Sequence, residues 1–324
     1  MIKSSLRAFL GMLFGFFGLV VGIVVIALVL GAMSGGKREI DGPTKVTVIP
    51  NHKGEKGSLS AHSPLILLLD ISGVIGIQDL NIETIRPQIE RSYAFEKGRI
   101  KGLLLTINSP GGGVTDSFAI YNLIKQYKEE LGIPVLAYAD GYCASGGFLI
   151  ACAADKIVAT PVSVIGSVGV RSTVFNVADT LEKLGVKAKM LSQGTDKGNL
   201  DPFIPWKEGD DEGAKEVMAG IYDLFLDAVT ANRPQMTRDK LINDYGARAY
   251  VAATAKEYGY IDGLVTTRRD ALRTLADALE ITDKEYQVIE LTAKSWLEEL
   301  VKSKSPLITG RLQHSVEVPP TVYN

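Results

Sequence analysis

Short apolar runs alternate with stretches of helical spacing along the middle of this 324-residue chain, and this alternation constrains the fold more than any other feature. Parallel strands need crossover connections, usually helices, so the order predicts an α/β domain with a mostly parallel sheet. The apolar runs have the length of buried strands and lie at residues 64–70, 101–107, 134–138, 156–159 and 187–191. The helical segments between them cover residues 83–95 and 114–131, and two more begin near residues 145 and 176.

After residue 206 the chain is mainly helical. The helices predicted there cover residues 212–233, 237–244, 252–258 and 268–279, and a last strand and helix cover residues 286–301. We assign residues 64–302 to one folded domain and the proline-containing residues 303–324 to a C-terminal tail.

The N-terminus carries a membrane-spanning signal. Residues 8–33 contain no charged side chain and consist mostly of Leu, Val, Ile, Phe and Gly. A spanning helix needs about 20 residues, whereas the apolar part of a secretory signal is typically about 7–15 long, so we expect an uncleaved transmembrane anchor at residues 1–34. Small residues follow the apolar run, which leaves a cleaved signal as the alternative. The Gly-, Ser- and Lys-rich residues 35–63 are expected to form a flexible linker.

Charge and residue types exclude several functions. Thirty-five Lys and Arg oppose 37 Asp and Glu without a basic stripe, so nucleic acid is not an expected partner. The two cysteines, Cys143 and Cys152, have no histidine nearby, and we expect them to be small buried residues rather than metal ligands. No metal and no cofactor are expected.

Two glycine-rich corners each follow a predicted strand. They read Asn-Ser-Pro-Gly-Gly-Gly-Val at residues 108–114 and Asp-Gly-Tyr-Cys-Ala-Ser-Gly-Gly-Phe at residues 140–148. Ligands of α/β folds bind where a strand ends and a helix begins, because backbone N–H groups are free there. Neither corner has the Gly-Lys-Ser/Thr ending of a phosphate-binding loop. Each corner alone is compatible with an ordinary turn, but together they favour an oxyanion hole.

Ser145 is the candidate nucleophile of the second corner. A serine at the start of a helix is commonly a helix cap. Here Gly146 and Gly147 remove side chains beside the hydroxyl, and the Gly146 N–H is available to stabilise a tetrahedral oxyanion.

The base for this serine is expected to be a lysine. The three histidines lie at positions 52, 62 and 314, in the predicted linker and tail, so a Ser-His-Asp triad is not expected. A lysine that is desolvated enough to become neutral can replace histidine. The candidates are Lys156, Lys183, Lys187, Lys189 and Lys197. Lys197 is favoured because the apolar segment 202–206 follows it in the same loop.

Five ordered pieces of sequence carry a family resemblance. They are the corner at 108–114, the nucleophile segment at 141–147, the segment Val-Ile-Gly-Ser-Val-Gly-Val at 164–170, a Gly-x-x-Lys loop at 194–197, and residues 248–262. Together they resemble the signal peptide peptidase A (protease IV) family of serine peptidases, in its short form with one catalytic domain. The resemblance implies a fold akin to the Clp protease and crotonase superfamily, with superhelical repeats of strands and helices.

The resemblance also implies roles for individual residues. By position, Ser145 matches the nucleophile, Lys197 the general base and Ser167 the hydroxyl that orients the lysine. Gly112 and Gly146 match the oxyanion donors. Asp196 departs from the family pattern, because a carboxylate beside the lysine favours the protonated ammonium.

A membrane-anchored serine endopeptidase is therefore the expected function. The family resemblance implies that it degrades remnant signal peptides and other apolar, extended peptides through an acyl-enzyme. It further implies a homo-oligomeric ring with active sites at subunit contacts, anchored by a single span in the plasma membrane with the catalytic domain outside the cytoplasm. The alternatives are a crotonase-type acyl-CoA enzyme and a non-catalytic membrane scaffold.

Overall fold

The computed structural model describes residues 45–77 and 80–292. The strands in these residues are β1 (Lys45–Ile49), β2 (Leu65–Ser72), β3 (Ile100–Ser109), β4 (Val135–Ala144), β5 (Lys156–Ala159), β6 (Val164–Gly166), β7 (Ala249–Val251), β8 (Gly263–Leu264) and β9 (Gln287–Thr292). The helices are α2 (Ile82–Ser92), α3 (Val114–Leu131), α4 (Gly146–Ala151), α5 (Ala178–Lys183), α6 (Glu212–Asn232), the π-helix η1 (Lys240–Tyr245), α7 (Ala252–Glu257) and α8 (Arg268–Ala278).

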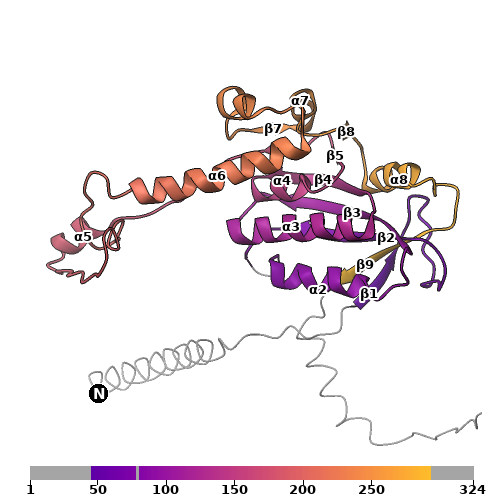
Figure 1. Ribbon diagram of the computed structural model, residues 1–324, viewed down its shortest axis with the longest axis horizontal. Coiled ribbons are helices and arrows are strands. Elements are labelled where there is room, and N and C mark those ends of the chain that lie inside the picture. Colours follow the sequence, from indigo (N-terminus) through magenta and orange to yellow (C-terminus); the bar gives the residue numbers. More distant parts are fainter. Residues whose placement is uncertain (1–44, 78–79, 293–324) are drawn as a thin grey trace, which may run out of the picture. The chain divides into compact units, whose positions relative to one another are not determined.

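One mixed sheet organises the described residues (Figure 1). Its main path runs β1-β9-β2-β3-β4-β5-β8, with β6 beside the end of β4 and β7 beside β6. The central strands β2, β3, β4 and β5 are parallel, whereas β1 with β9 and β6 with β7 are antiparallel. The expected α/β domain with a mostly parallel sheet is confirmed.

The middle residues of the central strands are mainly apolar because helices cover both faces of the sheet. Side chains alternate along β2, so Leu65, Leu67 and Leu69 join the core under α2, α3 and α4. Ile66 and Leu68 join the second core, under α8.

The bounds of α3 and β5 agree with the sequence-based prediction, whereas other segments, among them residues 45–49 and 187–191, differ from it. Residues 45–49 of the expected linker form β1, because they pair with β9 near the other end of the chain. Residues 187–191 are exposed and form no strand. The expected anchor at 1–34 and tail at 303–324 lie outside the described residues. In the part of the chain that is described, no helix has the length and apolar character needed to cross a membrane.

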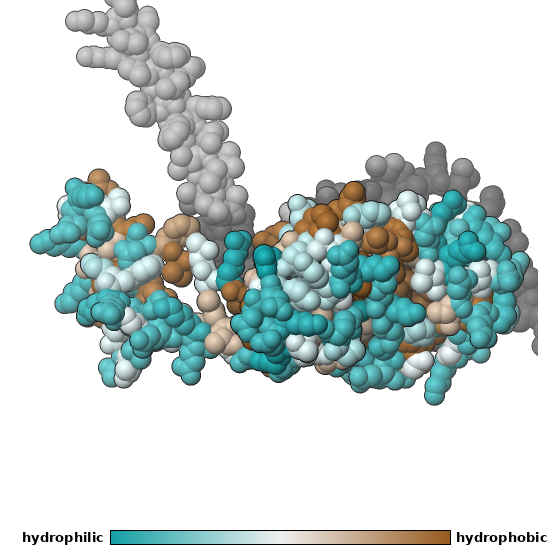
Figure 2. All heavy atoms as spheres, turned by 90° about the horizontal axis from the view of Figure 1, so that it is seen from above, coloured by the Kyte–Doolittle hydropathy of each residue, from teal (hydrophilic) through white to brown (hydrophobic). Residues whose placement is uncertain are grey.

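The segment from residue 171 to residue 224 is packed very little. It is fully described, and Ala178 is its single buried residue. Many of its large apolar side chains are exposed; those more than two-fifths exposed are Val174, Phe175, Leu184, Val186, Leu191, Phe203, Val217 and Leu224. Figure 1 shows α5 beyond the outer end of α6, and Figure 2 shows apolar residues (brown) among the hydrophilic ones there. We call residues 171–211 the arm.

Glu290 on β9 provides a test of charge burial in the sheet. Burial, and after it the nearby Asp70 carboxylate, raises the pKa of Glu290 above its usual value. The folded protein therefore holds this proton more tightly than the unfolded chain, and stability is lost as the pH rises above the unfolded pKa of about 4.3. Glu290→Gln should raise the Tm by a few degrees at pH 7 and leave it nearly unchanged at pH 3.5.

Thermal unfolding followed by circular dichroism at both pH values measures this difference. The matched control is Glu285→Gln, on an exposed residue, which should leave the pH dependence as it is. An unchanged or lower Tm of Glu290→Gln at pH 7 would contradict the prediction.

Candidate functional site

Ser145 lies between β4 and α4 with backbone angles φ 52° and ψ −123°. A positive φ is uncommon for a residue with a side chain, and such strain is retained where the surrounding structure enforces it. The Ser145 N–H donates to Gly166 O at 2.8 Å, and Ser145 O accepts from Leu149 N–H at 2.9 Å. Ser145 itself is half-buried, whereas every residue of α4 is buried. Backbone hydrogen bonds thus hold this serine in one orientation at the start of a buried helix.

The first glycine-rich corner packs directly against Ser145. Gly111 has φ 100°, and a β-carbon there would lie 2.7 Å from Ser145 Cβ. Ile75 supports the corner from the other side: its N–H donates to Gly111 O at 3.0 Å, and its carbonyl accepts from Gly113 N–H at 2.8 Å. Sequence reasoning named Gly112 but not Gly111, because a run of three glycines does not show which of them meets the serine.

The two expected oxyanion donors lie at this contact. Neither the Gly112 N–H nor the Gly146 N–H has an acceptor among the described residues. The Gly111 β-carbon position is also 2.9 Å from Gly146 N, so the two corners meet at that nitrogen. Free N–H groups beside a nucleophile can stabilise negative charge that develops on an attacked carbonyl oxygen.

Ser167 lies next to the residue that holds Ser145. It follows β6, has φ 55°, and donates its N–H to Arg248 O at 2.8 Å. Gly166, its neighbour, is the acceptor for the Ser145 N–H. The structure therefore brings Ser145, Gly112, Gly146 and Ser167 into one place.

Lys197 lies apart from these residues, in the arm. Hydrogen bonds tie its loop to the start of α5: Val177 N–H donates to Pro202 O, and Asn176 Nδ2 donates to Ile204 O, both at 2.8 Å. Lys197 is exposed and lines a cavity of about 190 Å³ within the arm. Across residues 45–77 and 80–292, no hydrogen bond or ion pair links it to Ser145.

The apolar segment expected to desolvate Lys197 is itself exposed. Phe203 and Trp206 are 52% and 37% exposed, so in a single chain they do not shield the lysine from water. The lysine and the serine are thus not assembled into a dyad within one copy of the described chain.

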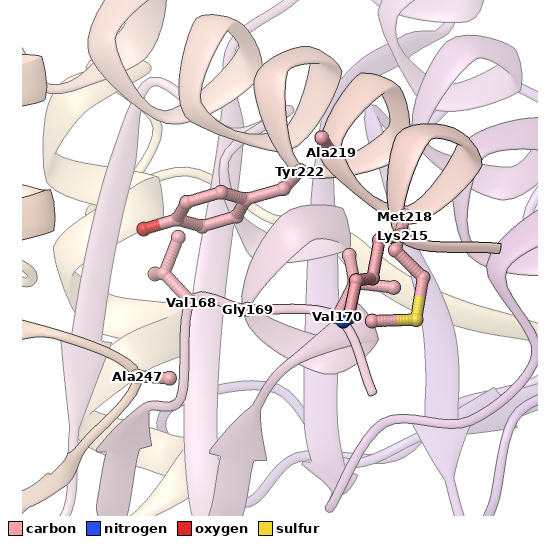
Figure 3. A pocket seen from close by; sticks show the side chains of 8 residues that line it. All are labelled: Val168, Gly169, Val170, Lys215, Met218, Ala219, Tyr222 and Ala247. Carbon is pink, nitrogen blue, oxygen red and sulfur yellow. The ribbon is translucent and has the colours of Figure 1, made fainter. Parts of the chain in front are cut away.

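A second cavity, of about 350 Å³, begins directly after Ser167 (Figure 3). Figure 3 shows side chains of α6 above the segment 168–170. The lining residues are Val168, Gly169, Val170, Lys215, Met218, Ala219, Tyr222 and Ala247. Most of this lining is apolar, so the cavity suits an apolar side chain. The cavity was not predicted from the sequence, although the α6 residues that line it recur at helical spacing.

Both cysteines are free and buried, as predicted. Burial raises the pKa of the Cys152 thiol to about 12 and raises that of Cys143 as well. They are therefore protonated at neutral pH and unsuited to act as nucleophiles. The described residues contain no group of three or more His, Cys, Asp or Glu side chains that could hold a metal ion.

Comparison with known proteins gives two family matches. The model of peptidase family S49 matches residues 128–282, a range that includes Ser145, Ser167 and Lys197. The Clp protease model matches residues 80–165, which include Gly112 and Ser145.

Similar proteins include relatives of different lengths. A Brucella abortus protein named Na(+)/H(+) antiporter NhaA is 34% identical over 188 residues, which are 58% of this chain and 25% of that protein. This chain thus spans a quarter of that relative. A signal peptide peptidase SppA from Enterococcus faecium is 28% identical over 302 residues, 86% of each chain. Among solved structures, ClpP1 from Listeria monocytogenes matches with 17% identity and a TM-score of 0.42, over 63% of this chain and 94% of its own.

The Gly111 contact predicts a substitution that blocks the reactivity of Ser145. Gly111→Ala places a methyl group against Ser145 and Gly146, in a backbone conformation that alanine adopts poorly. The rate at which a fluorophosphonate modifies Ser145 should fall about 100-fold or more, the effect of losing an oxyanion donor. Mass spectrometry of the Ser145 adduct measures this rate.

Gly98→Ala is the matched control, because Gly98 also has a positive φ (78°) but no atom within 4 Å of its β-carbon position. It should keep the wild-type rate. A wild-type rate for Gly111→Ala would mean that this corner takes no part in the site.

Proposed function

The chain belongs to peptidase family S49, and from this membership we propose that it is a serine endopeptidase with Ser145 as nucleophile and Lys197 as general base. The observation that carries the proposal is the backbone conformation and the surroundings of Ser145. Its strained backbone faces the Gly111 corner, beside the free N–H groups of Gly112 and Gly146. This arrangement suits attack on a carbonyl carbon.

In the proposed reaction, neutral Lys197 accepts the proton of Ser145 Oγ as Oγ bonds to the peptide carbonyl carbon. The Gly112 and Gly146 N–H groups stabilise the resulting oxyanion. The C–N bond then breaks, the leaving amine takes the proton from Lys197, and Ser145 carries an acyl group. Water attacks this ester with the same lysine as base and regenerates the enzyme. Ser167 orients the lysine, and the steps require no metal or cofactor.

We further propose that Lys197 reaches Ser145 from a second copy of the chain, in a homo-oligomeric ring. Two observations support this: the dyad is not assembled in one copy, and the arm and the outer half of α6 expose apolar side chains over a long stretch. Large apolar side chains exposed in such number are buried when a protein–protein interface covers them. A closed symmetric assembly would repeat the same contact at every subunit.

Assembly would also supply the desolvation that Lys197 lacks in a single chain. Packing Phe203 and Trp206 against a second copy would remove water from the loop that carries the lysine. Removing water disfavours the ammonium and favours the neutral amine that acts as base. The site would then become active only in the oligomer.

The proposed substrates are apolar, extended peptides, including remnant signal peptides. The cavity under α6 supports this, because its mainly apolar lining begins directly after Ser167. Residues 8–33 are proposed to anchor the protein in the plasma membrane by a single span, with the catalytic domain outside the cytoplasm. Such an anchor would hold the site near apolar segments in the membrane.

The experiment that tests this function is hydrolysis, in detergent, of a fluorogenic peptide with an apolar residue before the scissile bond. Wild-type turnover should rise with pH as the lysine loses its proton. Ser145→Ala and Lys197→Met should each reduce kcat by about 1,000-fold or more, because members of a catalytic unit act together. Lys187→Met, an exposed lysine in the same arm, should keep wild-type turnover.

Each assignment has its own contrary outcome. Turnover that survives Lys197→Met would show that another group is the base. Turnover that survives Ser145→Ala would remove the nucleophile. Saturable binding and turnover of an acyl-CoA in place of peptides would favour the crotonase-type alternative, and wild-type protein inert toward both would favour a scaffold.

A further inference from the structure

The strand that carries Ser145 contains an irregularity just before it. Ile107 of β3 pairs with Ala139 of β4, and the next pair is Ser109 with Cys143. This step covers two residues of β3 but four residues of β4. β4 therefore accommodates two additional residues across this step, in the manner of an enlarged β-bulge. Here β4 also stops pairing with β5 and starts pairing with β6. The bulge therefore sets the position of the last residues of β4 and, with them, of Ser145.

Side chains replace the missing strand partners at the bulge. The Gly141 N–H donates to Ser163 Oγ at 3.1 Å, and the Tyr142 N–H donates to Asn108 Oδ1 at 3.0 Å. Ser163 is fully buried, and its Oγ in turn donates to Ala139 O at 3.0 Å. Two neighbouring N–H groups of the bulge are therefore held by specific side-chain acceptors.

Asn108 differs from Ser163 because it also belongs to the oxyanion corner. Its carbonyl accepts the Gly73 N–H at 3.0 Å, and Gly73 leads to Ile75, which supports the corner. The amide of Asn108 fits closely over the bulge, since a β-carbon at Gly141 would lie 2.5 Å from its Oδ1. One side chain thus connects the strand of the nucleophile to the loops that carry the oxyanion donors.

We propose that Asn108 is a positioning residue whose side-chain oxygen, by holding the Tyr142 N–H, sets Ser145 against the Gly112 and Gly146 donors. The proposal rests on the proposed role of Ser145. Tyr142 is three residues before Ser145, and residues 142–144 between them pair with β6 as a regular strand. A displacement of the bulge is therefore passed to the serine, and the fit with the Gly111 corner tolerates little displacement.

Two variants of nearly equal size separate the acceptor from the volume of the side chain. Asn108→Asp keeps an oxygen that can accept the Tyr142 N–H, whereas Asn108→Leu has none. Asn108→Leu should lower both kcat and the rate of fluorophosphonate modification by about 10-fold or more, with KM within about twofold. Asn108→Asp should stay within about threefold of wild type. Asn243→Leu, at an exposed asparagine of η1, is the matched control and should behave as wild type.

Hydrogen exchange supplies a readout that does not depend on catalysis. In Asn108→Leu the Tyr142 amide should exchange faster than in wild type, while the amides of residues 136–138 keep their protection. In Asn108→Asp the Tyr142 amide should stay protected. Faster exchange along all of β4 would mean general destabilisation and would overturn the proposal. Wild-type rates in Asn108→Leu, or equal losses in Asn108→Asp and Asn108→Leu, would overturn it as well.

The outcomes for Asn108 and for the proposed function can be told apart. If the wild-type protein does not hydrolyse peptides and the fluorophosphonate does not modify Ser145, the proposed function fails. The exchange of the Tyr142 amide still reports in that case whether Asn108 holds the bulge.

Discussion

The hydrogen bond from the Ser145 N–H to Gly166 O, at 2.8 Å, is the interaction on which the site depends. It joins the end of β4 to β6 and fixes the peptide group before a serine whose φ is positive. Beyond β6 the chain continues through Ser167 into the wall of the apolar cavity. One strand pairing therefore sets Ser145, the neighbouring Ser167 and the cavity relative to one another. Because these groups are held by hydrogen bonds within the protein, their arrangement does not require a substrate.

The proposed base, Lys197, lies on surface that a single chain leaves uncovered. The core of the sheet is apolar on both faces and closed by helices, whereas the arm has one buried residue and many exposed apolar ones. Ordering such a segment costs conformational entropy that its own contacts do not offset. A partner surface that covers the arm would stabilise it and would shield Lys197 from water. Assembly of this kind would couple the packing of the arm to activity.

Local patterns in the sequence predicted much of the fold. Strands buried on both faces are apolar without interruption, and α3 has clear helical spacing and ends before Gly132, so its bounds agree with the prediction. The positions of Ser145 and the glycine corners followed from motifs at strand ends. β1 was not predicted, because its partner β9 lies near the far end of the chain. The separation of Lys197 from Ser145, the role of Asn108 and the α6 side of the cavity also depend on long-range packing that no local pattern reveals.

Co-expression of Ser145→Ala and Lys197→Met chains in equal amounts shows whether the proposed dyad is completed between two copies. Each chain alone lacks one member, but a mixed assembly contains contacts that join Ser145 of one copy to Lys197 of another. The mixed protein should recover about a quarter of wild-type peptide hydrolysis, as random pairing at a repeated interface requires. A mixture as inactive as either variant alone would rule out a dyad shared between copies and would place both of its members in one chain.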